Sequence, residues 1–218
     1  MFFLYTLIEY IEKNYIQKNS VEKRDYQINL ANQAMNENCV VVLPTGLGKT
    51  TIALHVIAEY LSKNSFGILF LAPTRVLVNQ HFEFLKKNLT IDDITLITGE
   101  DAVEKRTELW NGRIICATPE VARNDLNKKI ITSKQFSLVV FDEVHRTTGD
   151  YAYSSIAKHF EDTDTRLLGM TATLPSEQEK ATEILTRLKI SSVAERTENS
   201  PDVKPYIQET ETEWINVE

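Results

Sequence analysis

Residues 43–50 read LPTGLGKT, and this string constrains the fold more than any other part of the chain. The residues that lead into it, VVVL at 40–43, form an apolar and mostly β-branched run, short enough for a buried strand. Pro44 ends such a strand because proline has no N–H to donate to a ladder. From Lys49 to Leu61, apolar residues recur at helical spacing. The string therefore predicts a buried strand, a glycine-containing turn and a helix in direct succession.

The predicted turn has the chemistry of a phosphate-binding loop. Gly46 and Gly48 allow backbone conformations that other residues resist, and N–H groups at a helix start can converge on phosphate oxygens. Lys49 would reach the β and γ phosphates, and the Thr50 hydroxyl would contact Mg²⁺. The usual pattern begins with glycine, and Leu43 takes that position here. The alternative is a turn that binds nothing. We predict a nucleoside triphosphate site formed by Pro44, Thr45, Gly46, Leu47, Gly48, Lys49, Thr50 and Thr51.

Two acidic residues, Asp142 and Glu143, directly follow the apolar run FSLVVF at 136–141. Functional residues of open α/β sheets gather where strands end. We predict that Asp142 holds Mg²⁺ through water and that Glu143 orients and deprotonates an attacking water. The alternative is a solvated acidic loop. His145 is predicted to have a structural or coupling role. The other three histidines are interpreted as ordinary surface or boundary residues: His55, His81 and His159.

Several further strings occur in a fixed order along the chain: RDYQ at 24–27, APTR at 72–75, TG at 98–99, ATPE at 117–120 and TAT at 171–173. Together with LPTGLGKT and FDEVH, they resemble the motifs of superfamily-two helicases of the DEAD/DEAH class. The resemblance implies that ATP and Mg²⁺ bind the chain. It also implies that Gln27, with Arg24, reads the adenine, and that Thr171 and Thr173 couple the nucleotide to the nucleic acid.

The same resemblance assigns a nucleic-acid face, whose residues would be Thr74, Arg75, Gly99, Thr118 and Pro119. Their contacts should go mainly to sugar and phosphate, because a translocating motor cannot depend on base identity. Pro and Gly after strands are also ordinary loop residues, so each is open to a purely structural interpretation. The Arg75 guanidinium has the alternative of capping a carboxylate within the domain.

The strings VVLPTGLGKT, LFLAPTRVLVNQH, DEVHRTTGDYAY and LGMTATL resemble most closely the Hef, FANCM and Mph group, with Val144 where DEAH has alanine. This group implies DNA rather than RNA as the substrate. It also implies a second RecA-like domain, whose arginines stabilise the transition state. No second strand–helix series follows Lys189, and the group's helical insertion and nuclease region are not in this sequence. We therefore expect the isolated chain to bind ATP weakly and to hydrolyse it slowly.

Strand-like apolar runs alternate with helical patterns through most of the chain. The strand-like runs are at 39–43, 67–71, 94–98, 113–117, 137–141 and 166–169. The helical patterns are at 25–35, 50–61, 76–87, 102–110, 121–126, 151–159 and 176–188. Such alternation predicts an α/β fold with a mostly parallel sheet and helices on both faces. A RecA-like P-loop domain has this form.

We divide the chain of 218 residues into an N-terminal amphipathic helix or extension (1–22), a RecA-like ATP-binding domain (23–194) and an acidic linker toward a second domain (195–218). The linker has seven acids and two bases, so most of the net charge of −7 lies outside the domain. That leaves room for a local patch that binds nucleic acid. No apolar run approaches membrane-spanning length. Cys39 and Cys116 lie in apparent core strands, which indicates a cytoplasmic protein in a reducing compartment.

These observations predict the first motor domain of an ATP-dependent DNA helicase or translocase. The alternative is a nucleotide-gated module that senses RNA or branched DNA without unwinding it. Intact Glu143 favours the enzyme, because a pure sensor could lose that residue.

Overall fold

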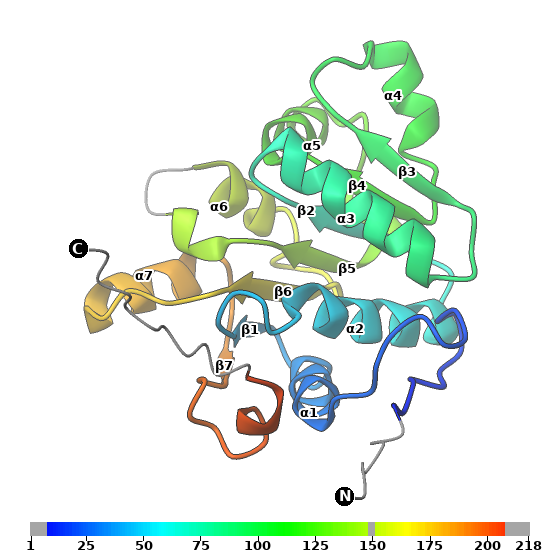
Figure 1. Ribbon diagram of the computed structural model, residues 1–218. Coiled ribbons are helices and arrows are strands. Elements are labelled where there is room, and N and C mark those ends of the chain that lie inside the picture. Colours follow the sequence, from blue (N-terminus) through cyan, green and yellow to red (C-terminus); the bar gives the residue numbers. More distant parts are fainter. Residues whose placement is uncertain (1–7, 148–150, 208–218) are drawn as a thin grey trace, which may run out of the picture.

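A parallel seven-stranded sheet forms the centre of the computed structural model, which describes residues 8–147 and 151–207 (Figure 1). The strand order is β3-β4-β2-β5-β6-β1-β7, and every pairing is parallel. The strands are β1 (Cys39–Val42), β2 (Gly67–Leu71), β3 (Ile94–Ile97), β4 (Ile114–Ala117), β5 (Phe136–Phe141), β6 (Arg166–Thr171) and β7 (Ser192–Glu195). The predicted α/β fold with a parallel sheet is confirmed.

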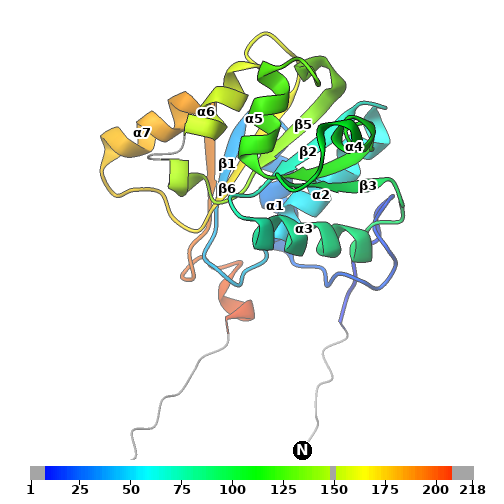
Figure 2. The same ribbon diagram turned by 90° about the horizontal axis from the view of Figure 1, so that it is seen from above.

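Helices cover both faces of the sheet (Figure 2). Those in the described part of the chain are α1 (Asp25–Ala34), α2 (Lys49–Lys63), α3 (Arg75–Asn88), α4 (Val103–Leu109), α5 (Pro119–Asn127), α6 (Tyr151–Lys158) and α7 (Gln178–Arg187). Helices α1, α2 and α3 cover one face, and α5, α6 and α7 cover the other. Side chains alternate along a strand, so Val41 packs in the core beneath α1, α2 and α3, and Val40 packs in the core beneath α5, α6 and α7. The sheet is therefore buried on both sides.

The topology brings the predicted site residues to one edge of the sheet. In a parallel sheet all strands end on the same side, and each string singled out in the sequence lies at a strand end, except RDYQ at 24–27, which begins α1. The phosphate loop follows β1, and Asp142 follows β5, with β6 between the two strands. Two strand spacings separate the ends of β1 and β5 by about 10 Å. The two predicted halves of the nucleotide site are thus neighbours, although about ninety residues of sequence lie between them.

The helix expected within residues 1–22 is absent from residues 8–22, which is a correction. Tyr10 forms an antiparallel bridge with Glu22, and Ile16 forms one with Leu89. The backbone turns at positive φ at Tyr15 and Asn19, which no α-helix permits. The apolar residues Ile11 and Ile16 of this segment are each buried in the core formed with α1, α2 and α3. Residues 1–7 lie outside the described part of the chain.

The chain on both sides of the expected boundary between domain and linker packs on the domain. Residues Ser192–Glu195 form β7, an edge strand paired with β1. Its apolar pattern is weak because one face is open, and Val193 is 45% exposed. Farther on, Val203 is fully buried and the Tyr206 ring lies 5.5 Å from the Tyr26 ring of α1. Figure 1 shows this segment beside α1. Residues 208–218 lie outside the described part.

Both cysteines are free and buried in the sheet, as expected for core residues. Burial raises the pKa of the Cys116 thiol far above its ordinary range, so this thiol is held in its neutral form. Within residues 8–147 and 151–207, no helix combines the length and apolar character needed to cross a bilayer.

Candidate functional site

The loop between β1 and α2 has the backbone that its glycines predict. Gly46 and Gly48 both have φ of +85°, and Gly48 caps the N-terminus of α2. A Cβ atom on Gly48 would lie 2.4 Å from the Gln27 amide nitrogen, whereas one on Gly46 would meet nothing within 4 Å. Gly48 is therefore required both by its conformation and by a close approach. The Gly46 side of the turn is open.

The charged and hydroxyl groups of the loop lie at the start of α2. The Lys49 ammonium donates a hydrogen bond to the Leu43 carbonyl at 3.2 Å, so the side chain folds back over the loop. Thr45 and Gly46 are exposed, and Lys49 and Thr50 are partly exposed. A cation, a hydroxyl and the N–H groups of a helix start therefore share one accessible turn. Such a turn suits a polyphosphate.

Gln27 lies against the phosphate loop and is 3% exposed. Its amide nitrogen donates to the Leu47 carbonyl at 2.9 Å, and the Tyr26 hydroxyl donates to the same carbonyl at 2.8 Å. The Gln27 amide oxygen is buried and has no hydrogen-bond partner among the described residues. Arg24 pairs with Glu22 at 3.1 Å, and its guanidinium lies 5.0 Å from the centre of the Tyr206 ring. Of the two predicted adenine-reading residues, Gln27 is thus bonded directly to the phosphate loop.

Asp142 is buried at the end of β5, with 4% of its surface exposed. Its backbone N–H donates to the Leu71 carbonyl at 2.9 Å, and its carbonyl accepts from the Tyr153 hydroxyl at 2.8 Å. Its carboxylate oxygen Oδ2 lies 2.7 Å from Nε2 of His81 on α3. No group of three or more His, Cys, Asp or Glu side chains suited to a metal ion occurs in the described residues. A lone carboxylate fits Mg²⁺, which keeps waters and takes phosphate ligands.

The interpretation of two histidines as surface or boundary residues is wrong. His81 is 8% exposed and His55 is 3% exposed, whereas His159 is partly exposed, as expected of a boundary residue. A signal for His81 was present in the sequence, since Val78, His81 and Leu85 share the buried face of α3. A polar residue on an apolar stripe needs a partner. That the partner of His81 is Asp142 is known only from the tertiary fold.

Glu143 and His145 link the end of β5 to the end of β6. Glu143 has φ of +54°, a strained conformation of the kind that concentrates at functional sites. His145 Nδ1 lies 3.1 Å from the Glu143 carboxylate and 2.8 Å from the Thr171 hydroxyl. Thr171 donates to the Thr173 carbonyl at 2.8 Å, and its own carbonyl accepts from the Leu43 N–H at 3.0 Å. The predicted coupling residues therefore form a continuous polar path to the phosphate loop.

The residues predicted to face nucleic acid are less uniform. Thr74, Arg75 and Gly99 are exposed, whereas Thr118 and Pro119 are buried at the start of α5. The Thr74 hydroxyl caps α3 by accepting from the Leu77 N–H at 3.3 Å. Arg75 forms an ion pair with Glu100. The alternative considered for Arg75, a carboxylate partner within the domain, is therefore what the structure contains.

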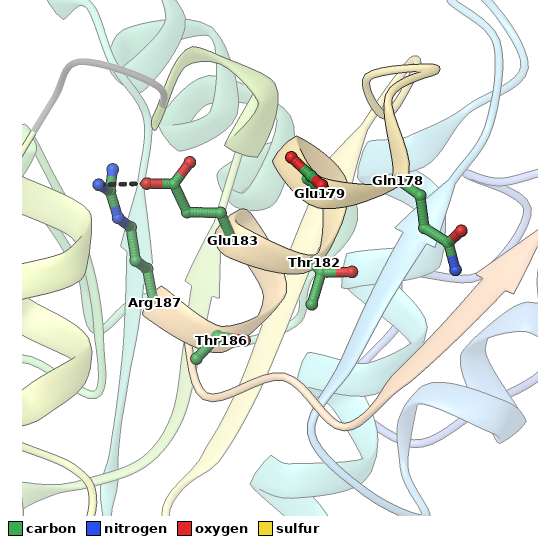
Figure 3. A pocket seen from close by; sticks show the side chains of 6 residues that line it. All are labelled: Gln178, Glu179, Thr182, Glu183, Thr186 and Arg187. Carbon is green, nitrogen blue, oxygen red and sulfur yellow. Dashed lines mark ion pairs between the residues drawn. The ribbon is translucent and has the colours of Figure 1, made fainter.

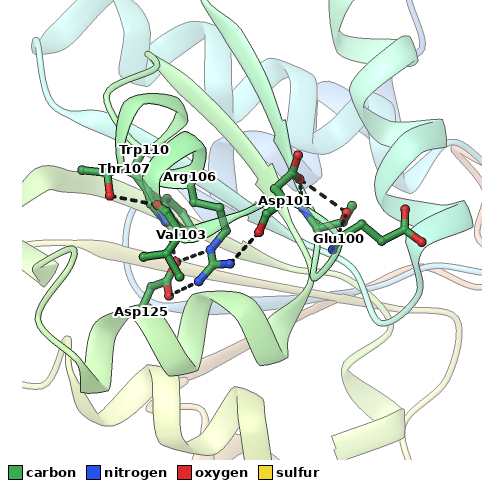
Figure 4. Close-up of polar contacts among 8 residues, drawn as sticks. Glu100, Asp101, Val103, Arg106, Thr107, Trp110 and Asp125 are labelled. Carbon is green, nitrogen blue, oxygen red and sulfur yellow. Dashed lines mark hydrogen bonds and ion pairs between the residues drawn. The ribbon is translucent and has the colours of Figure 1, made fainter.

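A buried polar network that the sequence did not reveal lies beside these residues (Figure 4). Arg106 of α4 donates two hydrogen bonds of 2.9 Å to Asp125 of α5, and Trp110 adds one of 2.8 Å. Burial raises the pKa of Asp125, but the bonds from Arg106 and Trp110 outweigh it and leave that pKa lowered. Arg106 also donates to the Asp101 carbonyl at 2.7 Å. The network ties the loop after β3 to α5.

A surface hollow on α7 contains none of the predicted site residues. It is lined by Gln178, Glu179, Thr182, Glu183, Thr186 and Arg187 (Figure 3). Among the residues that line the hollow, Arg187 forms an ion pair with Glu183. The hollow is thus a surface of one helix, formed by residues that the sequence did not assign to the candidate site.

Comparison with known proteins agrees with this geometry. A family model described as DEAD/DEAH box helicase matches residues 24–181, more than half of the chain. The helicase domain of Hef from Pyrococcus furiosus superimposes with a TM-score of 0.85 and 39% identity, covering 88% of this chain and 42% of that one. A DEAD box protein from Methanococcus jannaschii superimposes with a TM-score of 0.68 at 20% identity, covering 83% of this chain and 51% of that one, which supports the fold alone.

Two curated relatives extend the comparison. A Methanocaldococcus jannaschii protein, named as a candidate ATP-dependent RNA helicase, is 44% identical over 201 residues, or 91% of this chain and 26% of that protein. The ATP-dependent DNA helicase Mph1 of Saccharomyces cerevisiae is 36% identical over 208 residues, or 93% of this chain and 21% of that protein. The chain therefore spans about a quarter of the length of these relatives. It belongs to the DEAD/DEAH box helicase family and folds as a RecA-like helicase domain.

Proposed function

We propose that this chain is the first motor domain of an ATP-dependent DNA helicase or translocase, and that it hydrolyses ATP with Mg²⁺ when a second RecA-like domain is present. Membership of the family implies ATP binding. The observation that carries the proposal is that the phosphate loop and the acidic pair follow the ends of β1 and β5, two strands separated only by β6. Glu143, the candidate base, supports hydrolysis over a purely sensing role.

The residues divide the work of binding and hydrolysis. The backbone N–H groups after Gly46 and Gly48 hold the phosphates, and Lys49 offsets their charge. Thr50 and Asp142 are suited to hold a hydrated Mg²⁺, which when bound would neutralise charge on the β and γ oxygens. Glu143 orients the attacking water and accepts its proton. Its partly buried carboxylate beside His145 is held in place for that role.

The adenine end of the site is formed by Gln27 and Arg24. The Gln27 amide oxygen is a buried acceptor without a partner among the described residues, and the amino group of adenine is a donor that could satisfy it. Arg24 offers a planar guanidinium, a group that stacks on aromatic rings. The bond from Gln27 to the Leu47 carbonyl gives adenine recognition a direct connection to the phosphate loop.

DNA is the proposed substrate because Mph1 is named a DNA helicase, and the chain resembles Mph1 over most of its own length. It resembles the helicase domain of Hef to a similar extent. Thr74, Arg75 and Gly99 form the exposed part of the proposed nucleic-acid face. The arginines of a second RecA-like domain would complete the hydrolytic site. Without them we expect turnover to be lower by about 10³–10⁵, the usual worth of an arginine finger.

The test is a nucleotide titration of Lys49→Ala in the presence of Mg²⁺, with Lys63→Ala as the matched control. Both lysines lie on α2, but Lys63 is 61% exposed and pairs with Glu59 at the far end of the helix. We expect Lys49→Ala to weaken ATP binding by at least about 100-fold, since charge-assisted bonds to phosphate are lost. Lys63→Ala should bind as the wild type does, and both should melt as it does. Wild-type affinity in Lys49→Ala would contradict the proposal.

A further inference from the structure

We propose that His81 is a positioning residue for the Asp142 carboxylate: it engages one carboxylate oxygen, so that the other faces the hydrated Mg²⁺. This inference rests on the proposed function, because it assigns Asp142 to the metal. It adds a residue from α3, a helix whose first turn carries the proposed nucleic-acid contact Arg75.

The main chain of Asp142 is fixed, so the orientation of its carboxylate is what remains to be controlled. Its main chain is held on both sides, by the Leu71 carbonyl and by the Tyr153 hydroxyl. Among residues 8–147 and 151–207, the one hydrogen bond described for its carboxylate is that to His81 Nε2, at 2.7 Å. With Asp142 ionised, Nε2 carries the hydrogen and Oδ2 accepts it. Rotation of the carboxylate is thereby fixed, and Oδ1 is the oxygen that remains for the ion.

His81 is itself held rigidly, as a positioning residue must be. It is 8% exposed on the buried face of α3, and its ring centre lies 4.5 Å from that of Phe70 at a tilt of 38°. Phe70 belongs to β2, which pairs directly with β5, the strand that Asp142 follows. The ring is therefore packed against the same pair of strands that positions the carboxylate. Partners that hydrogen-bond metal ligands in this way are typically worth 10–100-fold in metal affinity.

A histidine that only satisfies a buried carboxylate would contribute to stability but not to the metal requirement. The Mg²⁺ concentration at half-maximal nucleotide binding separates the two roles. His81→Leu removes the donor and keeps an apolar side chain. His81→Gln restores a donor, because its amide nitrogen reaches about as far from Cβ as Nε2 does. His159→Leu is the matched control, since His159 is partly exposed and bonds Asn127.

The experiment uses the whole chain and a fluorescent ATP analogue, first in EDTA and then as Mg²⁺ is added. We expect His81→Leu to raise the Mg²⁺ concentration at half-maximal binding by about 10–100-fold, with metal-free affinity unchanged. His81→Gln should lie within about threefold of the wild type, and His159→Leu should coincide with it. His81→Asn, whose amide is too short to reach Asp142, should shift in the same direction as His81→Leu. Asn serves as the second loss-of-contact variant if Leu prevents folding, which melting curves would reveal.

The inference is overturned if the loss-of-contact variants titrate Mg²⁺ as the wild type does. It is also overturned if His81→Gln shifts as far as His81→Leu, because the ring's packing rather than its hydrogen bond would then matter. Failure of the proposed function has a different signature: the wild type itself would show no gain in nucleotide affinity with Mg²⁺, and the inference would fall with it.

Discussion

The two halves of the functional edge differ in how their polar residues are held. At β5, β6 and β1, Gln27, Asp142 and Thr171 are at most 4% exposed and bonded to other elements. At β2 and β3, Thr74, Arg75 and Gly99 are exposed, and Arg75 has only a surface ion pair described for it. The first half is organised before its ligand arrives. The second presents groups that can adapt to a polymer.

The difference follows from what each half is proposed to bind. The nucleotide site binds the same small ligand in every cycle, so hydrogen bonds already formed within the protein reduce the entropy cost of ordering the site. A nucleic-acid backbone that slides past the domain needs contacts that form and break repeatedly. The second half is nevertheless anchored from below, by the buried Arg106–Asp125 network that joins the loop after β3 to α5. In that half, the residues held rigidly are buried beneath the surface, and the exposed residues are not.

The most severe way to break the prearranged half is Gly48→Ala. The alanine would be strained by φ of +85° and its Cβ would meet the Gln27 amide nitrogen at 2.4 Å. We expect ATP affinity to fall by about 100-fold, because bonds to charged phosphate are each worth about 1.5–3 kcal/mol and the loop that makes them must move. Isothermal titration measures this loss.

Gly46→Ala is the control for Gly48→Ala, since it has the same φ but no atom within 4 Å of the added Cβ. It should cost only the roughly 1–2 kcal/mol of a left-handed conformation. Equal losses of ATP affinity in the two variants would mean that the contact with Gln27 is unimportant.

Asp125→Asn tests the buried anchor of the other half. It leaves Arg106 near a neutral side chain in a place where Asp125 is fully buried. Removing one partner of a buried pair typically costs about 3–5 kcal/mol, which urea unfolding would measure. Glu104→Gln, an exposed change on the same helix as Arg106, should cost almost nothing. Affinity for ATP should survive Asp125→Asn under native conditions, and a loss there would show that the halves are not independent.

His55 makes the stability of α2, the helix of the phosphate loop, depend on pH. Burial, aided by the nearby charge of Lys13, lowers the pKa of His55 from 6.5 to about 4. The unfolded chain therefore binds a proton between pH 6.5 and 4 that the folded chain does not, so stability falls as pH drops through this window. The loss is up to about 3 kcal/mol.

His55→Met should flatten the pH dependence, because methionine fills a buried space and does not titrate. Thermal unfolding between pH 7 and pH 4 would compare the variant with the wild type. His159→Met, at a partly exposed position, provides the control. A wild-type pH slope in His55→Met would assign the acid sensitivity to other groups.

The smallest expected effects concern Arg75. Glu100→Gln frees the guanidinium from an exposed ion pair, and such pairs are worth about 0–1 kcal/mol. We expect single-stranded DNA to bind about two- to fivefold more tightly, and Arg75→Glu to weaken binding by about tenfold. Fluorescence anisotropy at low salt measures both. ATP affinity should not change in either variant; an equal loss of both ligands in Arg75→Glu would indicate misfolding.

Much of the nucleotide half was predictable because its signals are local. The glycines at 46 and 48, the lysine after them and the acids after an apolar run are all readable within a few residues. The contacts of His81 and Tyr206 were not readable in this way, since their partners Asp142 and Tyr26 are far away in sequence. The four-residue strand β7 was missed because only Ala194 of its residues is buried, so it lacks a continuous apolar run.

By itself the sequence determined the alternation of strands and helices, the phosphate loop and the family, because periodicity and special backbone positions are properties of neighbouring residues. The tertiary structure alone decided that Gln27 points at Leu47, that Asp142 pairs with His81, and that Arg75 pairs with Glu100. Each of these contacts joins separate elements. Their partners depend on how the sheet orders its strands and how the helices pack on it, which no short stretch of sequence specifies.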